Sequence, residues 1–343
     1  MSVSHSEIIN ILTPILLQAF FSFAIAMALT PIYTFYAYKY KAWKQIRTTT
    51  TTGEKAVVLA KLHAAKHKRH IPTMAGVVTV AAIAITTLIG NLSRSQTYLP
   101  LFGLVAAGCV GLLDDYINIR GEGLGVAGLR SKIKFLLIFG IAAVGGFYFY
   151  YKLGFNIIHI PAVGDFTIGI LYIPLFIAVV VSTANAVNIT DGLDGLSGGL
   201  LAIAFGAYGV IAAAQGQYGV AAFCAAVVGA VLAYTWFNIY PARFFMGDTG
   251  SFALGTALGV VAMLTNSVVV LVIIGGVFVI DTLSSIIQIA SKKLFHRKIF
   301  LSAPLHHHLE AIGWPETKVT MRLWIIGMVF GIVGLLIGLI ARG

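Results

Sequence analysis

Ten apolar segments, each close to the length of a membrane-crossing helix, follow one another along this chain of 343 residues. A hydrocarbon core about 30 Å thick is crossed by about 20 apolar residues of helix. The segments have the approximate bounds 11–38, 72–91, 97–113, 133–151, 169–187, 196–214, 218–237, 249–264, 267–290 and 320–341. Hydrophobic residues make up 59% of the chain and charged residues 10%, which leaves too little polar surface to cover a soluble domain. The sequence therefore predicts an all-α polytopic membrane protein, with residues 1–343 forming one integral membrane domain.

The positions of lysine and arginine predict how this domain is oriented in the membrane. Of the 23 basic residues, 20 lie in or beside the odd-numbered loops between predicted spans, and the exceptions are Arg94, Lys152 and Arg342. Because cytoplasmic loops collect lysine and arginine, we expect the odd-numbered loops in the cytoplasm and both termini outside. The net charge of +11 is then mainly a topology signal. Binding of nucleic acid is not indicated, since that would need a basic soluble face with stacking aromatic residues.

The stretch NAVNITDGLDGLSGG at 185–199 interrupts an apolar region that is too long for one helix. Asp191 and Asp194 would each cost roughly 2.5 to 3.5 kcal/mol near the bilayer centre, so we expect the chain to break here. If the next helix begins in this stretch, the i, i+3 spacing places both carboxylates on one side, near the positive end of its dipole. Helix capping is the simpler interpretation of either aspartate alone. The neighbouring glycines favour a ligand site, because glycine lets a ligand approach the backbone closely.

Three further polar clusters lie at predicted span ends or in the last long loop. GLLDDY at 111–116 contains adjacent carboxylates, which are typical of metal sites and acid–base pairs, although a solvated helix end also fits. FMGDTGS at 245–251 places an aspartate among small residues at a helix start, which suits either a cap or a site for a metal and a phosphate. SAPLHHHLE at 302–310 has successive histidines, which favour phosphate binding or proton transfer over a zinc site, with surface decoration as the alternative.

The predicted topology places all four clusters on the cytoplasmic side, so they could converge at one site. Clustered carboxylates accept a phosphorylated ligand only when a divalent cation accompanies it. Aspartate oxygens without cysteine suit Mg²⁺, or Mn²⁺, better than zinc. A cation-coupled transporter is the alternative from another functional class, because acidic residues and broken helices inside the membrane also mark such proteins.

The four motifs GLLDDY, NAVNITDGLDGL, FMGDTGS and APLHHHLE, in this order, resemble those of the polyprenyl-phosphate N-acetylhexosamine-1-phosphate transferases. The unbroken PLHHHLE is most similar to the subgroup that uses a muramoyl-pentapeptide donor. The resemblance implies transfer of phospho-N-acetylmuramoyl-pentapeptide from its UDP conjugate to undecaprenyl phosphate, which gives lipid I and UMP for peptidoglycan synthesis. It also implies Mg²⁺ dependence, a homodimer, and a place in the bacterial cytoplasmic (inner) membrane with the catalytic face towards the cytoplasm. The alternative within the superfamily is a transferase that begins a surface glycan from UDP-N-acetylglucosamine or another UDP-sugar.

The resemblance further implies roles for individual residues. The catalytic groups are expected to be Asp114, Asp115, Asp248, His306 and His307, with Asp248 and Asp115 as metal ligands. The nucleotide contacts are expected to be Asn188, Asp191, Asp194, Asn238 and Phe245, the last because an aromatic ring can stack on uracil. The phosphate contacts are expected to be Lys68, Arg69, Lys132 and His308. Two departures from the family pattern are Ala75 within PTMAG, where a glycine is usual, and Asp281, where the subgroup often has glutamate.

Overall fold

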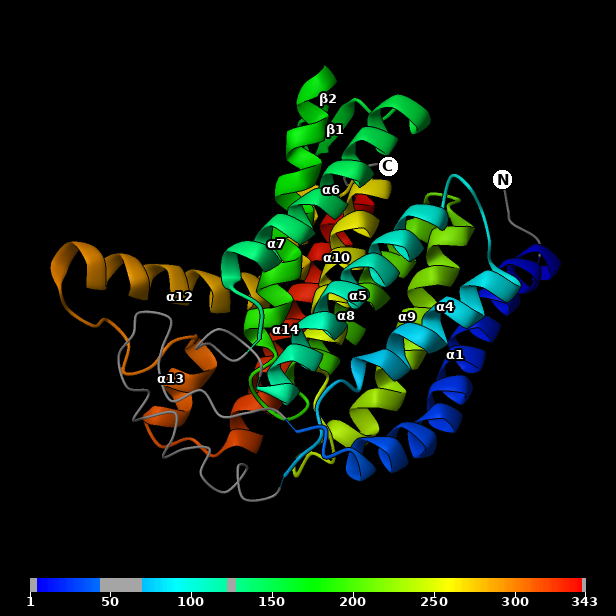
Figure 1. The fold of residues 1–343 in the computed structure, drawn as a ribbon. Coiled ribbons are helices and arrows are strands. Elements are labelled where there is room, and N and C mark those ends of the chain that lie inside the picture. Colours follow the sequence, from blue (N-terminus) through cyan, green and yellow to red (C-terminus); the bar gives the residue numbers. More distant parts are fainter. Residues whose placement is uncertain (1–4, 44–69, 122–127, 341–343) are drawn as a thin grey trace.

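The computed structural model describes residues 5–43, 70–121 and 128–340, and this part of the chain is almost entirely helical (Figure 1). Within it, eight helices are long and apolar enough to cross a membrane. They are α1 (His5–Lys39), α5 (Tyr98–Arg120), α6 (Ser131–Leu153), α7 (Tyr172–Thr190), α8 (Leu196–Ala214), α9 (Tyr218–Asn238), α10 (Gly247–Leu264) and α14 (Glu316–Ile340). The prediction of an all-α polytopic membrane protein is confirmed.

The two remaining predicted spans are not straight membrane-crossing helices. The first, α4 (Gly76–Gly90), has only 15 residues, although it is apolar. The second is divided into α11 (Val268–Ile274) and α12 (Gly276–Phe295), which are bent by 81° at Gly275. Figure 1 shows α12 leaving the bundle sideways. The segment predicted as a span at 267–290 is therefore broken in two at this bend.

The polar residues of α12 explain why it leaves the bundle. Four of them recur at helical spacing and are buried, namely Asp281, Ser284, Gln288 and Ser291. Two of them have partners in the segment that follows: Gln288 Nε2 donates to the Phe300 carbonyl at 2.9 Å, and Ser291 Oγ to the Arg297 carbonyl at 2.9 Å. The opposite face, with Leu283 and Ile286, is exposed. A helix with one buried polar face and one exposed apolar face suits the membrane surface better than the bilayer centre.

A short hairpin forms in the loop between α6 and α7. β1 (Ile157–Ile160) and β2 (Gly164–Thr167) pair antiparallel, and the short 3₁₀ helix η1 (Gly169–Leu171) leads from them into α7. The His159 backbone N–H donates to Asn266 Oδ1 at 3.0 Å, which ties the hairpin to the turn between α10 and α11.

The helices α4, α5 and α7 surround α10, all of whose residues are buried. Glycines allow the close approach. A Cβ on Gly111 of α5 would overlap the Asp248 carbonyl, and one on Gly76 would overlap the Gly250 backbone. The N-terminal turn of α10, which carries Asp248, is therefore held by its backbone against two neighbouring helices.

Replacing Gly111 with alanine is expected to separate α5 from α10 and to destabilise the protein by about 1 to 3 kcal/mol, as overpacking of a core does. The thermal unfolding midpoint, measured in detergent, should fall accordingly. Gly108→Ala is the matched control one turn earlier, because its Cβ would meet neighbouring side chains at an ordinary 3.5 Å. Equal unfolding midpoints for the two variants would contradict this packing argument.

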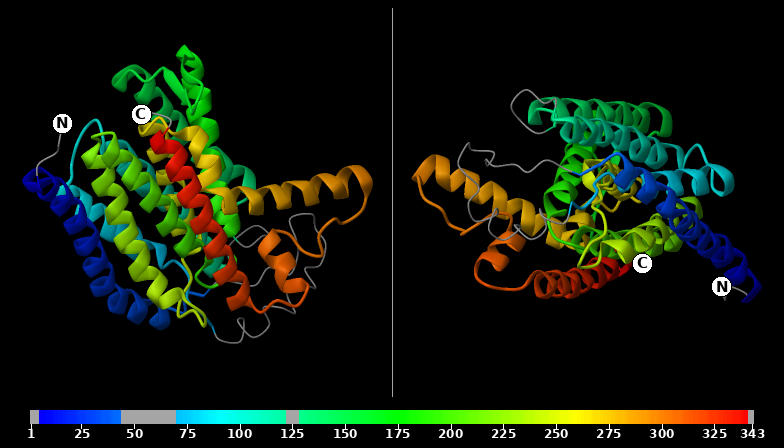
Figure 2. Two further views of the ribbon diagram at one scale, coloured as in Figure 1. Left: turned by 180° about the vertical axis from the view of Figure 1, so that it is seen from behind. Right: turned by 60° about the horizontal axis from the view of Figure 1, so that its bottom comes forward.

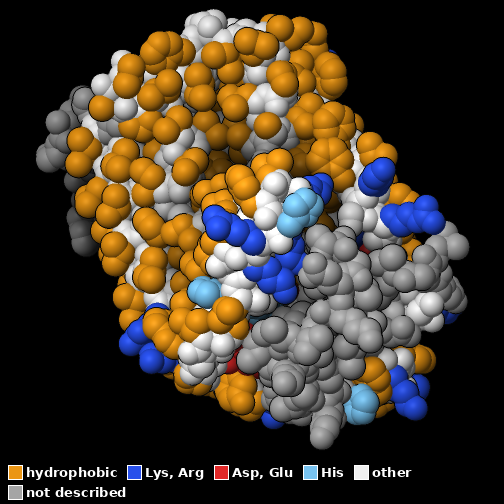
Figure 3. Space-filling model, turned by 90° about the vertical axis from the view of Figure 1, so that its left-hand side faces the viewer, with side chains coloured by type: hydrophobic (Ala, Val, Ile, Leu, Met, Phe, Trp, Pro, Cys, Tyr) orange, Lys and Arg blue, Asp and Glu red, His pale blue; other side chains and the backbone are white. Residues whose placement is uncertain are grey.

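The start of α1 and the end of α14 lie at the same end of the bundle as the hairpin, whereas α13 (Leu305–Ala311) lies at the other end (Figure 1 and Figure 2). On the face in Figure 3, hydrophobic side chains cover the upper part, and Lys, Arg and His side chains gather below it. This arrangement agrees with termini on one side and basic loops on the other. Which end faces the cytoplasm stays a prediction.

Candidate active site

Two buried aspartates share one lysine at the end of the bundle opposite the hairpin. Lys134 Nζ lies 3.1 Å from Asp114 Oδ2 and 2.9 Å from Asp248 Oδ2. Asp114 is fully buried and Asp248 is 6% exposed. The backbone N–H of Leu129 donates to Asp114 Oδ1 at 2.5 Å, so the chain before α6 wraps this carboxylate. A cation between two carboxylates offsets the repulsion between their negative charges.

The neighbouring Asp115 holds the start of α10. Its Oδ1 accepts the Asp248 N–H at 3.1 Å, and its Oδ2 accepts the Thr249 N–H at 2.9 Å and the Thr249 hydroxyl at 2.8 Å. A carboxylate from α5 thus binds donors that the first helical turn cannot satisfy itself, where the helix dipole also favours negative charge. Asp115 positions Asp248 in this way. The span predicted from the sequence, 97–113, ends just before these aspartates. The helix α5 instead continues to Arg120, so both aspartates lie within it.

Lys134 was not among the residues predicted from the sequence, whereas Lys132 was predicted as a phosphate contact. Lys132 is exposed, and residues two apart on a helix do not face the same way. The signal was present in the helical phase of α6, whose buried residues include Ile138, Ala142 and Phe149. One turn before Ile138 on that same face is residue 134. The basic residue on the buried face, not the exposed one, reaches the carboxylates.

Within the stretch at 185–199, Asp191 and Asp194 lie in a turn between two helices and not in the first turn of a helix. α7 ends at Thr190 and α8 begins at Leu196, after Gly195 with a left-handed φ of 78°. Asp191 accepts a hydrogen bond from the Ser197 hydroxyl. Asn188 Nδ2 donates to Ser251 Oγ at 2.8 Å, which joins the end of α7 to the start of α10. This turn therefore lies beside the Asp248 region, as the sequence had predicted.

Two predicted nucleotide contacts, Asp194 and Asn238, hold this turn in place. Asp194 Oδ2 accepts the Ala242 N–H at 3.0 Å. Asn238 Oδ1 accepts the Gly195 N–H at 2.8 Å, and its Nδ2 donates to the Phe244 carbonyl at 2.8 Å. Each side chain is only 2% exposed. Their contacts favour a supporting role, and direct contact with a nucleotide stays a prediction.

Phe245 lies immediately before the first turn of α10. Its backbone N–H donates to the Pro72 carbonyl at 2.8 Å, and its carbonyl accepts the Ala75 N–H at 3.1 Å. The PTMAG segment at 72–76 is therefore paired with the segment that leads into α10. The Phe245 side chain is half-buried, so stacking on a uracil ring stays a prediction.

The first histidine of the run forms a buried pair with Asp281. His306 Nδ1 lies 2.7 Å from Asp281 Oδ2, and both side chains are within 1% of full burial. His306 Nε2 is buried without a hydrogen-bond partner among the described residues. A Cβ on Gly192 would overlap this nitrogen, so the ring is directed at the 191–195 turn. Asp281, which the sequence analysis noted only as a departure, thus orients the ring that reaches the turn.

The other histidines have different surroundings. His307 Nδ1 lies 2.8 Å from Glu310 Oε2, and its ring packs against that of His306 with centroids 4.2 Å apart. His308 Nδ1 accepts the Leu301 N–H at 3.3 Å and its ring meets Phe300, so its contacts hold the loop. Lys68 and Arg69, two predicted phosphate contacts, lie outside the described residues.

The carboxylates fit a divalent cation that arrives with a phosphorylated ligand. Within the described residues no three acidic, histidine or cysteine side chains form a metal site by themselves. Asp114 and Asp248 nevertheless direct their oxygens at one ammonium group, and Mg²⁺ is often held by one or two carboxylates plus phosphates and water. Asp115 as a ligand stays a prediction, since its oxygens already accept hydrogen bonds from α10.

Known proteins are similar to this chain over almost its full length. A profile of glycosyl transferase family 4 matches residues 97–266. The protein named phospho-N-acetylmuramoyl-pentapeptide-transferase in Geobacillus kaustophilus is 44% identical over 324 residues, which cover 92% of this chain and 95% of the relative. The chain belongs to the phospho-N-acetylmuramoyl-pentapeptide-transferase family. Members with this name from Anoxybacillus flavithermus and Chloroflexus aurantiacus are 42% and 36% identical and cover 94% and 99% of this chain, or 97% and 94% of the relatives.

This phospho-N-acetylmuramoyl-pentapeptide-transferase family member brings together groups from distant parts of its sequence. Asp114, Lys134 and Asp248 form one cluster, which continues through the Ser251–Asn188 hydrogen bond to the 191–195 turn and from there to His306.

Proposed function

We propose that this protein transfers phospho-N-acetylmuramoyl-pentapeptide from its UDP conjugate to undecaprenyl phosphate, forming lipid I and UMP. The observation that carries the proposal is the ammonium of Lys134 held between the buried carboxylates of Asp114 and Asp248 at the start of α10. The whole chain would act as one unit in the bacterial inner membrane, with this end of the bundle in the cytoplasm and a homodimer as the expected assembly.

A groove of about 350 Å³ supports a lipid acceptor. It lies between α7 and the α11–α12 bend, and it is lined almost wholly by apolar side chains. Its lining includes Val187 and Thr282, the neighbours in sequence of Asn188 and Asp281. A polyprenyl chain in this groove would bring its phosphate to the polar cluster while its hydrocarbon stays out of water.

The chemistry requires positioning and charge neutralisation more than a base. The second pKa of a phosphate monoester is near 6, so the acceptor phosphate is largely dianionic at neutral pH. Its oxygen attacks the sugar-linked phosphorus of the donor, a new P–O bond forms, and the bond to UMP breaks. Lys134 would stabilise the negative charge that collects on the phosphoryl oxygens, and Asp114 and Asp248 hold its ammonium in place. When bound, Mg²⁺ would add charge neutralisation of the donor diphosphate.

The surrounding residues would orient the donor. Asn188 and Asp191 lie at the end of α7, next to the start of α10, and offer polar groups to the nucleotide end. His306 would present Nε2 to a ligand at the 191–195 turn, because Asp281 fixes the position of Nδ1. We also propose that His307 and Phe245 contact the donor.

The function is tested with purified protein in detergent, where no ion gradient can exist. We expect lipid-linked product and UMP from undecaprenyl phosphate and UDP-N-acetylmuramoyl-pentapeptide with Mg²⁺, loss of product on addition of EDTA, and recovery with excess Mg²⁺. UDP-N-acetylglucosamine is the parallel donor. Product from that donor alone would replace the muramoyl assignment with a surface-glycan transferase, and no product from either donor would refute the transferase proposal.

A further inference from the structure

A second groove opens between α1, α4 and the last turns of α5, and it shares no residue with the groove beside α12. Its volume is about 670 Å³, and most of its lining is aliphatic or tyrosine. The proposed reaction assigns nothing to it. From Leu29 to Tyr40 along α1 the lining extends roughly 16 Å at 1.5 Å per residue, about half of a 30 Å hydrocarbon core. This length matches the acyl region of a single leaflet.

Cationic and aromatic groups gather at the end of this groove that lies nearer the candidate active site. Arg120 lines it, and its guanidinium lies 4.7 Å from the centroid of the Tyr116 ring. Lys39 Nζ lies 5.7 Å from the Tyr40 ring, which stacks on Tyr36. None of the described residues that line the groove is acidic. Tyrosine and basic residues at a span end are the groups that meet lipid headgroups.

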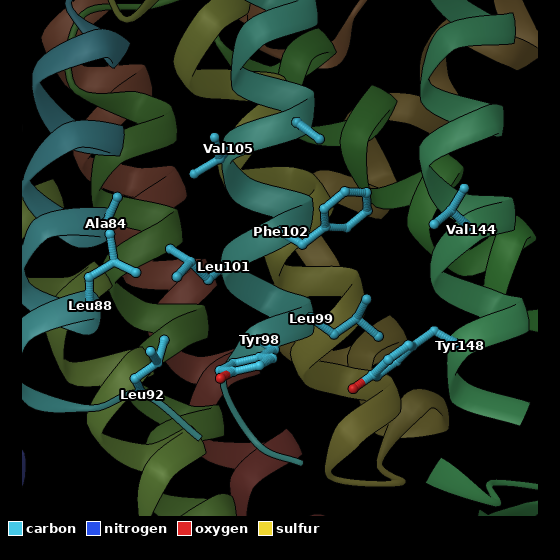
Figure 4. A pocket seen from close by; sticks show the side chains of 11 residues that line it. Ala84, Leu88, Leu92, Tyr98, Leu99, Leu101, Phe102, Val105, Val144 and Tyr148 are labelled. Carbon is cyan, nitrogen blue, oxygen red and sulfur yellow. The ribbon is translucent and has the colours of Figure 1, made fainter. Parts of the chain in front are cut away.

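A third groove serves as a comparison, because its described lining has no basic residue. It lies between α4, α5 and α6 towards the hairpin end, has a volume of about 730 Å³, and is equally apolar (Figure 4). Its described lining includes Tyr98 and Tyr148 but no lysine or arginine. A hydrocarbon chain fits both grooves, whereas only the groove between α1, α4 and α5 has a basic residue, Arg120, in its described lining.

We propose that the groove between α1, α4 and α5 binds one anionic phospholipid from the leaflet at the active-site end. The acyl chain lies along α1 and α4, and the phosphate lies beside Arg120. A basic residue near a membrane surface attracts an anionic lipid by about 1 kcal/mol, which is about fivefold in affinity. The proposal does not depend on which UDP-sugar the protein uses.

The wall of this groove also supports the candidate active site. The Tyr33 hydroxyl donates to the Thr73 carbonyl at 2.5 Å, and both residues line the groove. The same segment accepts the Phe245 N–H on the Pro72 carbonyl at 2.8 Å and donates from Gly76 to the Met246 carbonyl at 2.9 Å. A lipid packed against Tyr33 and Thr73 would restrain the segment that holds the start of α10. Bound phospholipid should therefore raise the unfolding midpoint.

The test uses the full-length protein in phosphatidylcholine nanodiscs. Each sample contains a trace of one probe, either phosphatidylglycerol or phosphatidylcholine, and both probes carry a photoactivatable acyl chain. Labelled peptides are identified by mass spectrometry. Val77→Trp fills the proposed groove, and Val105→Trp fills the control groove, where the replaced valine is also 38% exposed. Arg120→Gln removes the cation and leaves the groove open.

We expect the phosphatidylglycerol probe to label α1 and α4, and Val77→Trp, but not Val105→Trp, to remove that labelling. Arg120→Gln should reduce the preference for phosphatidylglycerol over phosphatidylcholine about fivefold. Equal labelling by both probes in the unaltered protein, or labelling that persists in Val77→Trp, would overturn the proposal. If undecaprenyl phosphate displaces the probe and unlabelled phosphatidylglycerol does not, the groove binds the lipid substrate, and the proposal is overturned as well.

Discussion

Asp248→Asn is expected to lower turnover about 10³-fold, a loss typical of removing one group that stabilises charge in the transition state. Asparagine preserves the size of the side chain at the start of α10 but lacks the negative charge that holds Lys134 at 2.9 Å. It is also a poorer Mg²⁺ ligand than a carboxylate. The measurement is the initial rate of UMP release at saturating concentrations of both substrates.

The control for this variant is Asp165→Asn, which alters an exposed aspartate in the hairpin at the other end of the bundle. It should retain the activity of the unaltered protein. The asparagine variant should also keep a well-defined unfolding transition, because the substitution leaves in place the backbone hydrogen bond from residue 248 to Asp115. Activity of Asp248→Asn within a few-fold of the control would contradict the role given to this carboxylate.

Lys134→Gln is expected to reduce turnover about 10²-fold to 10³-fold and to lower stability by about 3 kcal/mol. Removal of the ammonium leaves the carboxylates of Asp114 and Asp248 close together without the cation between them. The two effects are separated by measuring turnover well below the unfolding midpoint of the variant. Lys134→Arg retains the positive charge, and its unfolding midpoint should lie closer to that of the unaltered protein.

Lys132→Gln is the matched control for this experiment, since it makes the same chemical change two residues earlier on the same helix. Lys132 is exposed, so the Lys132→Gln variant should lose little stability. This pair of variants also decides between the sequence-based choice of Lys132 as a phosphate contact and the position that the geometry favours. A larger loss of turnover in Lys132→Gln than in Lys134→Gln would favour Lys132 as the phosphate contact.

Much of the fold could be predicted from the sequence, because a helix in lipid must satisfy its backbone hydrogen bonds internally and present mainly apolar side chains to the lipid. The segments predicted at 196–214 and 249–264 match α8 and α10 within two residues. The segment at 267–290 is not one continuous helix, since it bends by 81° at Gly275. Its total hydropathy was high enough for a span, but the polar residues of its second half find partners in the loop that follows.

The kind of chemistry at the candidate site could also be predicted from the sequence, but the contacts between its residues could not. Aspartates, an asparagine and histidines at the ends of spans indicated a phosphate site, and Asn188 and His306 do lie beside the 191–195 turn. Residue types alone did not separate Asp114, which faces Lys134, from Asp115, which binds the backbone of α10. Two adjacent residues on a helix point in different directions, and only the position of α10 shows what each direction meets.

The sequence by itself determined the membrane class, the number of apolar segments and the residue types at the site, because these follow from hydropathy and from chemistry that is local in the chain. The tertiary structure decided which charges meet. Lys134 reaches Asp248 across 114 residues of sequence, and it does so because the glycines at 76 and 111 let α4 and α5 pack against the backbone of α10. Such a contact depends on the distances between helices, which no property of a single segment specifies.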